Sequence, residues 1–338
     1  MTKERVLVVG AGGISGAWFP PLLEEKLQIV GVVDKFLGSA QTAVEKWKLA
    51  CQASDDLEKT LRETKPDFVI NLTIPEAHYE ICATAMKNGA HVIVEKPLTA
   101  TMEEACELLK ISQQAGKMLM VSQSRRWDAN HDLTRRVLDS GQIGDITTVN
   151  CDFYMGCHFG GFREAMASPL ILDMAVHHFD LARYFSGLDA VAVYAHEFNP
   201  KGSWYKNDVA ATCIFEMNNG AVFTYRGSWC AEGMHTSWNG DWRFIGENGT
   251  VEMAKDLAPT GQVVKEHNAD FNLPLKDVEV PAPRPIVSAM HGGLLEMLAF
   301  LREGTMPQTE AHDNIKSLAM VLAAIESSQT RQRVEIKI

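Results

Sequence analysis

The sequence lacks three signals that would place it in a specialised class of protein. Its seven cysteines form no Cys-x-x-Cys pair, so neither a disulfide framework nor a thiolate zinc site is indicated. No apolar stretch approaches the ~18 residues that a membrane-spanning helix needs. There is no basic run and the formal net charge is −11, which argues against a nucleic acid or an anionic membrane as partner.

The start of the chain gives no sign of export. A short apolar stretch, Val6–Val9, follows the first residues, and no cleavage site comes after it. Scattered cysteines suit reduced thiols, so we expect a cytoplasmic protein. The length of 338 residues suggests roughly two domains, and 46% hydrophobic with 22% charged residues is ordinary for a soluble globular enzyme.

A glycine-rich turn follows the first apolar segment. Val6–Val9 predicts a strand, and the run 10–16, Gly-Ala-Gly-Gly-Ile-Ser-Gly, predicts a turn into a helix, the first βα unit of a dinucleotide fold. Gly10 would make the tight turn, and Gly12 would let the backbone approach a pyrophosphate. Ser15 replaces the usual third glycine or alanine, and it is small enough to keep helix and strand close.

An acidic residue stands where such a fold needs one. Asp34 ends the apolar segment Gln28–Val33, at about the spacing of the carboxylate that meets the ribose 2′-hydroxyl of NAD. A carboxylate there would repel a 2′-phosphate, so NAD is favoured over NADP, although the neighbouring Lys35 weakens that preference. The alternative is a solvated turn residue, which the upstream glycine turn makes less attractive.

A lysine closes a later strand of the same half. Strand and helix patterns alternate as far as Val121, which predicts an α/β domain with a doubly wound parallel sheet, a Rossmann fold. The apolar run Ala90–Val94 leads into Glu95-Lys96-Pro97, so Lys96 is expected at the ligand-binding edge of the sheet. There Lys96 could hydrogen-bond a reacting oxygen; the alternative is a surface lysine at a strand end.

The second half has a different pattern. Alternating apolar and polar residues predict further strands, and Asn218-Asn219-Gly220 is a hairpin signal between two of them. We expect an α+β domain built on a large, mostly antiparallel sheet. The boundary is placed after residue 123, which gives an NAD-binding domain over 1–123 and a substrate-binding and oligomerisation domain over 124–338.

A helix is predicted from Ser168-Pro169 to Gly187, with Ser168 as its N-cap. Asp173 and His177 are four residues apart, so a regular helix would stack them on one face. A carboxylate one turn from an imidazole can orient it as a general base for a substrate hydroxyl. A structural pair is the alternative, and a shared metal is disfavoured because no third ligand motif stands out.

These motifs together resemble the glucose-fructose oxidoreductase/inositol dehydrogenase family, called Gfo/Idh/MocA. The matching segments are 10–14, Thr73-Ile74-Pro75 with His78, and 89–98, of which the last is highly specific. The resemblance implies that Lys96, Asp173 and His177 form the catalytic group. It also implies an open-faced sheet that pairs subunits, hence a homodimer or homotetramer. The expected cofactor contacts are Gly10, Gly12, Gly13, Ile14, Asp34, Thr73, Pro75, His78, Glu95 and Lys96.

The sequence thus predicts an NAD(P)-dependent dehydrogenase that acts on the CH–OH group of a sugar, polyol or sugar acid, with NAD as cofactor and no metal. One alternative is a relative that retains NAD and uses transient oxidation for glycoside cleavage or elimination; another is a non-catalytic sugar- or NAD-sensing protein. The expected substrate contacts are Arg125, Trp127, Tyr154, His158, Arg163 and Trp229.

Overall fold

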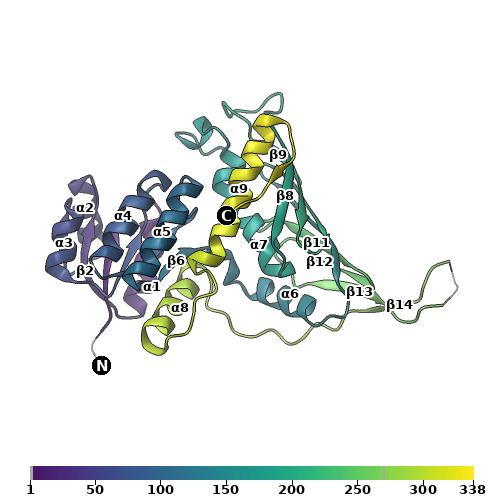
Figure 1. Cartoon of the computed structure of the whole chain (residues 1–338), viewed down its shortest axis with the longest axis horizontal. Helices are drawn as coiled ribbons and strands as arrows, with labels where there is room; N and C mark the ends of the chain where they lie inside the picture. The colour runs from purple at the N-terminus through teal and green to yellow at the C-terminus, as the bar shows by residue number, and fades with distance from the viewer. Residues whose placement is uncertain (1–2, 269–270) are drawn as a thin grey trace. The chain divides into compact units, whose positions relative to one another are not determined.

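The computed structural model describes residues 3–268 and 271–338, and its internal contacts divide the chain into two compact units. The first unit comprises Met1–Ser124, Val287–Leu318 and Ile338, and the second comprises Arg125–Ile286 and Ala319–Lys337. The chain passes into the second unit after Ser124, returns to the first at Val287 and passes into the second again after Leu318 (Figure 1). Within the described ranges, no helix has the length and apolar character needed to cross a membrane.

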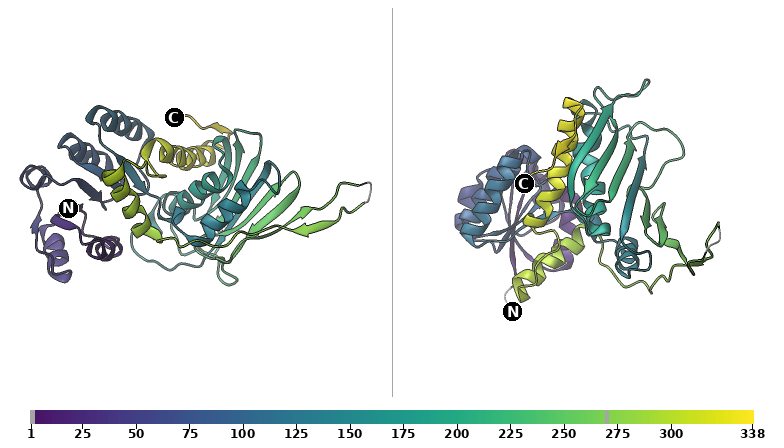
Figure 2. Two further views of the ribbon diagram at one scale, coloured as in Figure 1. Left: turned by 90° about the horizontal axis from the view of Figure 1, so that it is seen from below. Right: turned by 45° about the vertical axis from the view of Figure 1, so that its right-hand side comes forward.

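The first unit is built on a six-stranded parallel sheet, as the sequence predicted. The strand order is β3-β2-β1-β4-β5-β6, so the direction of winding reverses between β1 and β4. Helices lie on both faces of this sheet (Figure 2). The strands are β1 (Arg5–Val9), β2 (Gln28–Val33), β3 (Gln52–Ser54), β4 (Phe68–Asn71), β5 (His91–Glu95) and β6 (Leu119–Ser122).

The helices of the first unit begin and end where the local sequence requires. Thr101 caps α5 by accepting a hydrogen bond from the backbone N–H of Glu104, and Gly116 ends it in the left-handed conformation. The central strands β1, β4 and β5 are almost wholly buried, which is why most of their residues are apolar. The helices are α1 (Ser15–Glu24), α2 (Leu37–Lys46), α3 (Leu57–Thr64), α4 (Pro75–Lys87), α5 (Met102–Ala115) and α8 (Ala289–Glu303).

The second unit is built on a nine-stranded sheet in the order β14-β13-β12-β11-β7-β10-β9-β8-β15. Among the strand pairings of the described residues in this sheet, only that of β10 with β7 is parallel, so the expectation of a mostly antiparallel sheet is confirmed. Gly220, with φ +87°, makes the hairpin turn between β9 and β10. The strands are β7 (Ile146–Tyr154), β8 (Ala190–Phe198), β9 (Ala210–Met217), β10 (Val222–Ser228), β11 (Asp241–Gly246), β12 (Gly249–Met253), β13 (Thr260–Val264), β14 (Leu275–Asp277) and β15 (Val334–Glu335).

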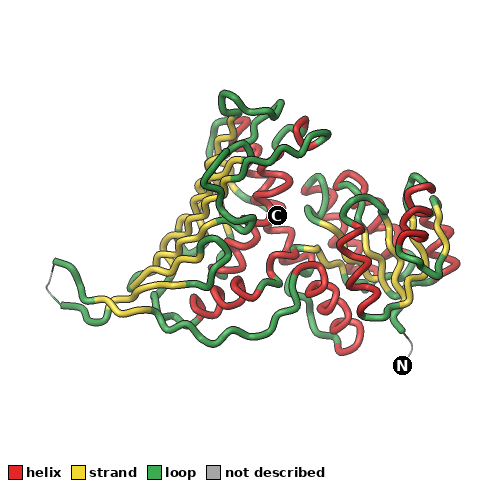
Figure 3. The backbone as a smooth tube through the Cα atoms, turned by 180° about the vertical axis from the view of Figure 1, so that it is seen from behind, coloured by secondary structure: helices red, strands yellow, loops and turns green. Residues whose placement is uncertain are grey.

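One face of this sheet is covered and the other is open. Helices α6 (Ala129–Asp139) and α7 (Val176–Ser186) and the second part of α9 (Ala311–Thr330) lie along one face (Figure 3). Phe179 and Phe185 on α7 pack edge-on against rings of the sheet, with centroids 4.8 Å from Phe215 and 5.2 Å from Trp242. Aromatic pairs of this kind fix α7 on the sheet.

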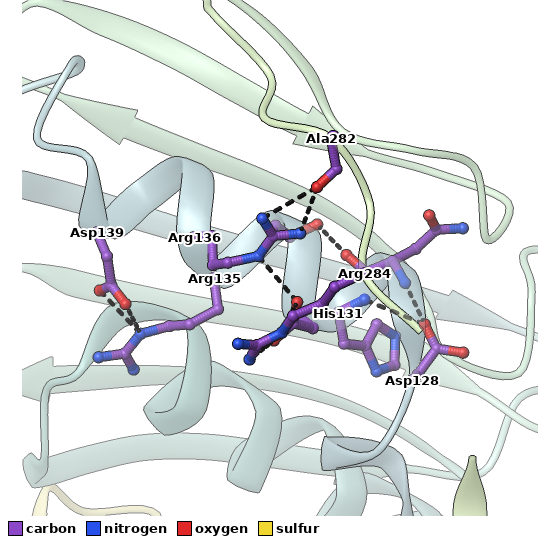
Figure 4. Close-up of polar contacts among 10 residues, drawn as sticks. Asp128, His131, Arg135, Arg136, Asp139, Ala282 and Arg284 are labelled. Carbon is purple, nitrogen blue, oxygen red and sulfur yellow. Dashed lines mark hydrogen bonds and ion pairs between the residues drawn. The ribbon is translucent and has the colours of Figure 1, made fainter. Parts of the chain in front are cut away.

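A polar network ties α6 to the segment that leads back toward α8. Asp128 caps α6 by accepting from the backbone N–H groups of Asn130 and His131. Asp132 lies between two guanidinium groups and accepts from Nε of Arg136 at 2.9 Å and of Arg284 at 3.0 Å. Arg136 also donates to the carbonyl oxygen of Ala282 (Figure 4). The segment around 282–284 is therefore fastened to α6 by charge-assisted hydrogen bonds.

Candidate functional site

The nucleotide edge of the first unit forms where the carboxyl ends of β1 and β4 meet. Gly10 follows β1 with φ +97°, and a Cβ atom on it would lie 2.8 Å from the carbonyl carbon and oxygen of Leu72. Only glycine fits this close approach. A Cβ atom on Gly12 or Gly13 would have no heavy atom within 4 Å, so these residues expose bare backbone in front of α1. Such a surface at a helix N-terminus suits an anionic pyrophosphate.

Asp34 is held at this edge by backbone donors. Its Oδ2 accepts from the N–H of Ala11 at 2.8 Å, and its Oδ1 accepts from the N–H of Phe36 at 2.8 Å. The first contact joins the end of β2 to the glycine turn. A carboxylate oxygen can accept more than one hydrogen bond, so Asp34 keeps capacity for ribose hydroxyls.

The Glu95-Lys96-Pro97 segment is supported from inside the unit. The indole Nε1 of Trp18 on α1 donates to Oε1 of Glu95 at 2.8 Å, and both side chains are buried. Burial raises the pKa of the Glu95 carboxyl above its usual value. Lys96 is half-buried directly after β5, and its peptide bond to Pro97 is cis. Glu95 is thus turned to the interior, and we assign it to holding the Lys96 loop rather than to contact with a cofactor.

His78 is also an interior residue. It lies on α4, which begins at Pro75, and it is completely buried. Its Nδ1 is 2.8 Å from the carbonyl oxygen of Pro97, and its Nε2 is 3.2 Å from that of Thr73. The Thr73 hydroxyl donates to Oδ1 of Asn71 at 2.6 Å. From the sequence, His78 was expected to contact the cofactor directly. In the structure it joins two loops at this edge, and we revise its role accordingly.

Four apolar side chains are exposed at this edge, and three of them, Phe36, Leu37 and Ile74, were not among the expected cofactor contacts. They follow the ends of β1, β2 and β4, and they are Ile14, Phe36, Leu37 and Ile74. Ile14 was expected to contact the cofactor only as part of the glycine turn. Their positions in the loops after Gly10, Asp34 and Thr73 could have identified them as cofactor contacts, because the flat faces of nucleotide rings bind against apolar surface.

In the second unit, the segment that carries Asp173 is not a regular α-helix. Residues Leu170–Ala175 form a π-helical turn, and α7 begins only at Val176. From the sequence, a regular helix was expected to place Asp173 and His177 on one face. Because Asp173 lies in a π-helical turn, their spacing of four residues does not by itself give that arrangement. Ser168 does not cap the helix either; its hydroxyl donates to Oε2 of Glu197 at 3.1 Å. π-Helical turns are frequent at functional sites because they redirect side chains.

Arg163 is a charged residue bonded to Asp173. Its Nε donates to Oδ2 of Asp173 at 2.7 Å, and its guanidinium lies over the rings of Phe159 and Phe162, 5.2 and 5.0 Å from their centroids. The cation is thus shared between a carboxylate and two aromatic faces. Arg163 was expected to contact substrate; the structure places it beside the candidate catalytic carboxylate, and its contact with a substrate stays a prediction.

His177 and His178 lie in different surroundings. His177 is half-buried on α7, whereas His178 is fully buried against Phe153 and Tyr225. Burial, reinforced by the nearby Arg125, holds the pKa of His178 well below its usual value, so this imidazole is neutral. Of the two, only His177 has exposed surface to offer a substrate.

The remaining expected substrate contacts are spread over the second unit. Trp127 and Trp229 are buried, and Arg125 donates to Asn239, with burial lowering the pKa of Arg125 to about 10. Tyr154 is half-buried at the end of β7. His158 is exposed; its ring stacks on Trp204 at 3.7 Å, and its Nε2 is 2.8 Å from Oε1 of Glu232. Their contact with a substrate stays a prediction.

Over residues 3–268 and 271–338, no group of three or more histidine, cysteine, aspartate or glutamate side chains is arranged to hold a metal ion.

Comparisons with known proteins agree with this architecture. Residues 4–123 match the family model "Oxidoreductase family, NAD-binding Rossmann fold", and residues 131–252 match "GFO/IDH/MocA C-terminal domain". The chain is 29% identical to D-glucoside 3-dehydrogenase of Escherichia coli, over 59% of each chain. It is 26% identical to scyllo-inositol 2-dehydrogenase (NAD(+)) of Bacillus subtilis, over 58% of each chain. The chain thus spans less than two thirds of these curated relatives.

A solved structure extends the likeness of the fold to the whole chain. An oxidoreductase from Agrobacterium radiobacter, solved with NAD+, L-tartaric acid and magnesium, superposes with a TM-score of 0.85 over 99% of both chains, at 20% identity. The first unit is accordingly an NAD-binding Rossmann domain. Its glycine turn, Asp34 and the bare backbone of Gly12 and Gly13 fit that cofactor.

The two kinds of glycine at this edge should separate stability from cofactor binding. Gly10→Ala places a methyl group against the Leu72 backbone at a positive φ, so the free energy of unfolding should fall by about 2 kcal/mol or more. The methyl group of Gly13→Ala meets no protein atom, so this substitution should change the free energy of unfolding by less than about 0.5 kcal/mol. It should nevertheless weaken NAD binding. Urea unfolding and NAD titration measure the two effects. Equal destabilisation by both substitutions would contradict the assigned geometry.

Proposed function

Because the chain belongs to the Gfo/Idh/MocA family of NAD-binding oxidoreductases, we propose that it transfers a hydride between NAD and a secondary alcohol of a sugar, polyol or sugar acid. The observation that carries the proposal lies within the first unit. The bare backbone of Gly12 and Gly13 and the half-buried Lys96 stand at the same edge of one sheet, after β1 and β5. A cofactor site and a cation suited to a reacting oxygen therefore share that edge.

The carboxylate of Asp34 supports NAD as the preferred cofactor. Its two oxygens are fixed by the N–H groups of Ala11 and Phe36, so a negative charge stands beside the glycine turn. A ribose 2′-hydroxyl can donate to that charge, whereas a 2′-phosphate would be repelled. NADP is the less favoured cofactor on this account.

The proposed chemistry assigns one task to each of three side chains. The chemistry that bound NAD would supply is a hydride acceptor for the carbon that bears the hydroxyl group. His177 takes the hydroxyl proton as general base, and the ammonium group of Lys96 stabilises the negative charge that develops on the oxygen. Asp173, held by Arg163, orients His177 or a neighbouring substrate hydroxyl. The alcohol loses one hydride and one proton and becomes a ketone.

Two curated relatives favour this class of substrate. Those proteins are named as dehydrogenases of D-glucosides and of scyllo-inositol, and both names denote oxidation of a hydroxyl-bearing carbon. The alternatives are a relative that retains NAD and uses transient oxidation for glycoside cleavage or elimination, and a non-catalytic sensor. Retention of Lys96, Asp173 and His177 weighs against the sensor.

Turnover should require both Lys96 and His177. With a panel of hexoses, methyl glucosides, inositols and uronic acids, the wild type should produce NADH from at least one member. Lys96→Ala and His177→Ala should each lower kcat by roughly 10²–10⁴-fold, because each removes a group that handles the reacting proton or oxygen. Lys110→Ala, a substitution on the exposed side of α5, is the control. Undiminished turnover in both variants would refute the assignment.

Arg163 should act on turnover through Asp173. Arg163→Met removes the cation that fixes Oδ2 of Asp173, and kcat should fall about tenfold while NAD affinity stays unchanged. Arg163→Lys should recover part of the loss, since it restores the charge without the fork geometry. The control is Arg62→Met, which breaks an exposed ion pair with Glu58 in the first unit. A change in NAD affinity rather than in kcat would speak against this role.

The open face of the nine-stranded sheet is proposed to pair two copies of the chain, in a homodimer or a homotetramer. Exposed apolar side chains on neighbouring strands, Tyr194, Ile214 and Val222, supply apolar surface of the kind that association buries.

Ile214→Glu should lower the mass measured by light scattering toward that of one chain, because it places a charge in this surface. Met306→Glu, at an exposed site in the first unit, should leave the mass unchanged. A wild type that is monomeric at micromolar concentration would contradict the proposal.

A further inference from the structure

His78 is a buried imidazole that faces two carbonyl oxygens. Its Nδ1 lies 2.8 Å from the oxygen of Pro97, and its Nε2 lies 3.2 Å from the oxygen of Thr73. Carbonyl oxygens only accept hydrogen bonds, and a neutral imidazole carries a single N–H. A neutral His78 can therefore donate to one of the two carbonyls, whereas the imidazolium form can donate to both.

Two features of the surroundings of His78 shift its pKa in opposite directions. Burial lowers its pKa below the usual value, and the carbonyl contacts counteract burial without overcoming it. His78 is therefore neutral at neutral pH when the site is empty of ligand, and one ring nitrogen then presents its lone pair to a carbonyl oxygen. His91 offers a contrast in the same unit, because its Nδ1 accepts from the N–H of Met118 at 2.8 Å, which suits a neutral ring.

The two carbonyls belong to the two loops that flank the nucleotide edge. Thr73 lies between β4 and α4, and Pro97 follows Lys96 at the end of β5. An anionic pyrophosphate at this edge favours the charged form of a nearby imidazole. We propose that His78 joins these two loops and takes up a proton when NAD binds, so that both carbonyls receive a hydrogen bond only in the complex. The proposal rests on NAD binding and not on the identity of the substrate.

The other titratable groups around His78 set the size of the effect. Glu76, on the same helix, is the charged group that favours a protonated His78. Lys96 precedes Pro97 and disfavours it, while Glu95 is buried with its carboxyl pKa raised and contributes less negative charge. Cys82, one turn along α4, has a pKa raised by burial to about 12 and stays neutral. The pyrophosphate is then the added charge that shifts the balance.

Calorimetry of NAD binding to the full-length protein tests the proposal directly. Titrations of NAD in buffers with different ionisation enthalpies, between about pH 6.3 and 8, give the number of protons taken up per NAD bound. We expect uptake of a fraction of one proton near the acidic end, falling toward zero as the pH rises. Because the complex holds its proton more tightly, NAD affinity should increase as the pH falls, by at most about tenfold per pH unit for a single proton. Absence of proton uptake by the wild type would overturn the proposal.

Variants assign the proton to this residue. His78→Asn and His78→Gln keep one amide donor but cannot titrate, so they should bind NAD with an affinity that no longer rises as the pH falls and should show no uptake. His91→Asn, at the opposite end of β5, should retain the wild-type uptake. Uptake that persists in both His78 variants would overturn the proposal.

A measurement without substitution at His78 guards against variants that fail to fold. The histidine ring nitrogens of the ¹⁵N-labelled wild type report protonation directly. We expect one ring, still present in the His91→Asn spectrum, to move toward the imidazolium form when NAD is added. A set of ring signals whose protonation does not change would overturn the proposal.

Discussion

The close approach of the Gly10 turn to the backbone of Leu72 is the constraint on which the nucleotide edge depends. The missing side chain of Gly10 lets the ends of β1 and β4 come together, where a Cβ atom would meet the Leu72 carbonyl at 2.8 Å. The amide of Gly10 donates to the carbonyl oxygen of Val33, which brings the end of β2 to the same point. Three strand ends are thus fixed around one glycine, and Asp34, Thr73 and the open backbone of Gly12 take their positions from it.

Buried polar contacts hold the functional loops in each unit. An unpaired polar group in the interior is costly, so each such contact favours one arrangement of the loop that it serves. In the first unit Trp18 holds Glu95, and His78 joins the Thr73 and Pro97 loops. In the second, Arg126 binds Asp180 of α7 through two hydrogen bonds of 2.7 Å. The start of the π-helical turn is fixed by Ser168 and Glu197, where burial raises the pKa of Glu197 to about 7.

Local sequence predicted the features that depend on neighbouring residues. The parallel sheet, the Gly10 turn and the hairpin at Gly220 all follow from strand periodicity or glycine conformation. Contacts between distant segments could not be predicted from local sequence. Trp18 and Glu95 are 77 residues apart, and no short motif marks their hydrogen bond.

The segment that carries Asp173 and His177 also has a feature that local sequence did not predict. A spacing of four residues implies stacking only in a regular α-helix, and the π-helical turn at Leu170–Ala175 changes that relation. Arg163 was expected from the sequence only as a substrate contact, because its pairing with Asp173 depends on the fold of the loop that carries it.

The most direct test of the central claim follows the transferred hydrogen itself. The protein is incubated with NAD and hexoses, methyl glucosides, inositols and uronic acids that carry deuterium at their hydroxyl-bearing carbons, and the nicotinamide product is analysed by mass spectrometry. We expect NADH to accumulate with one deuterium in its ring, together with the corresponding ketone. Unlabelled nicotinamide with every member of the panel, while NAD binds normally, would contradict it.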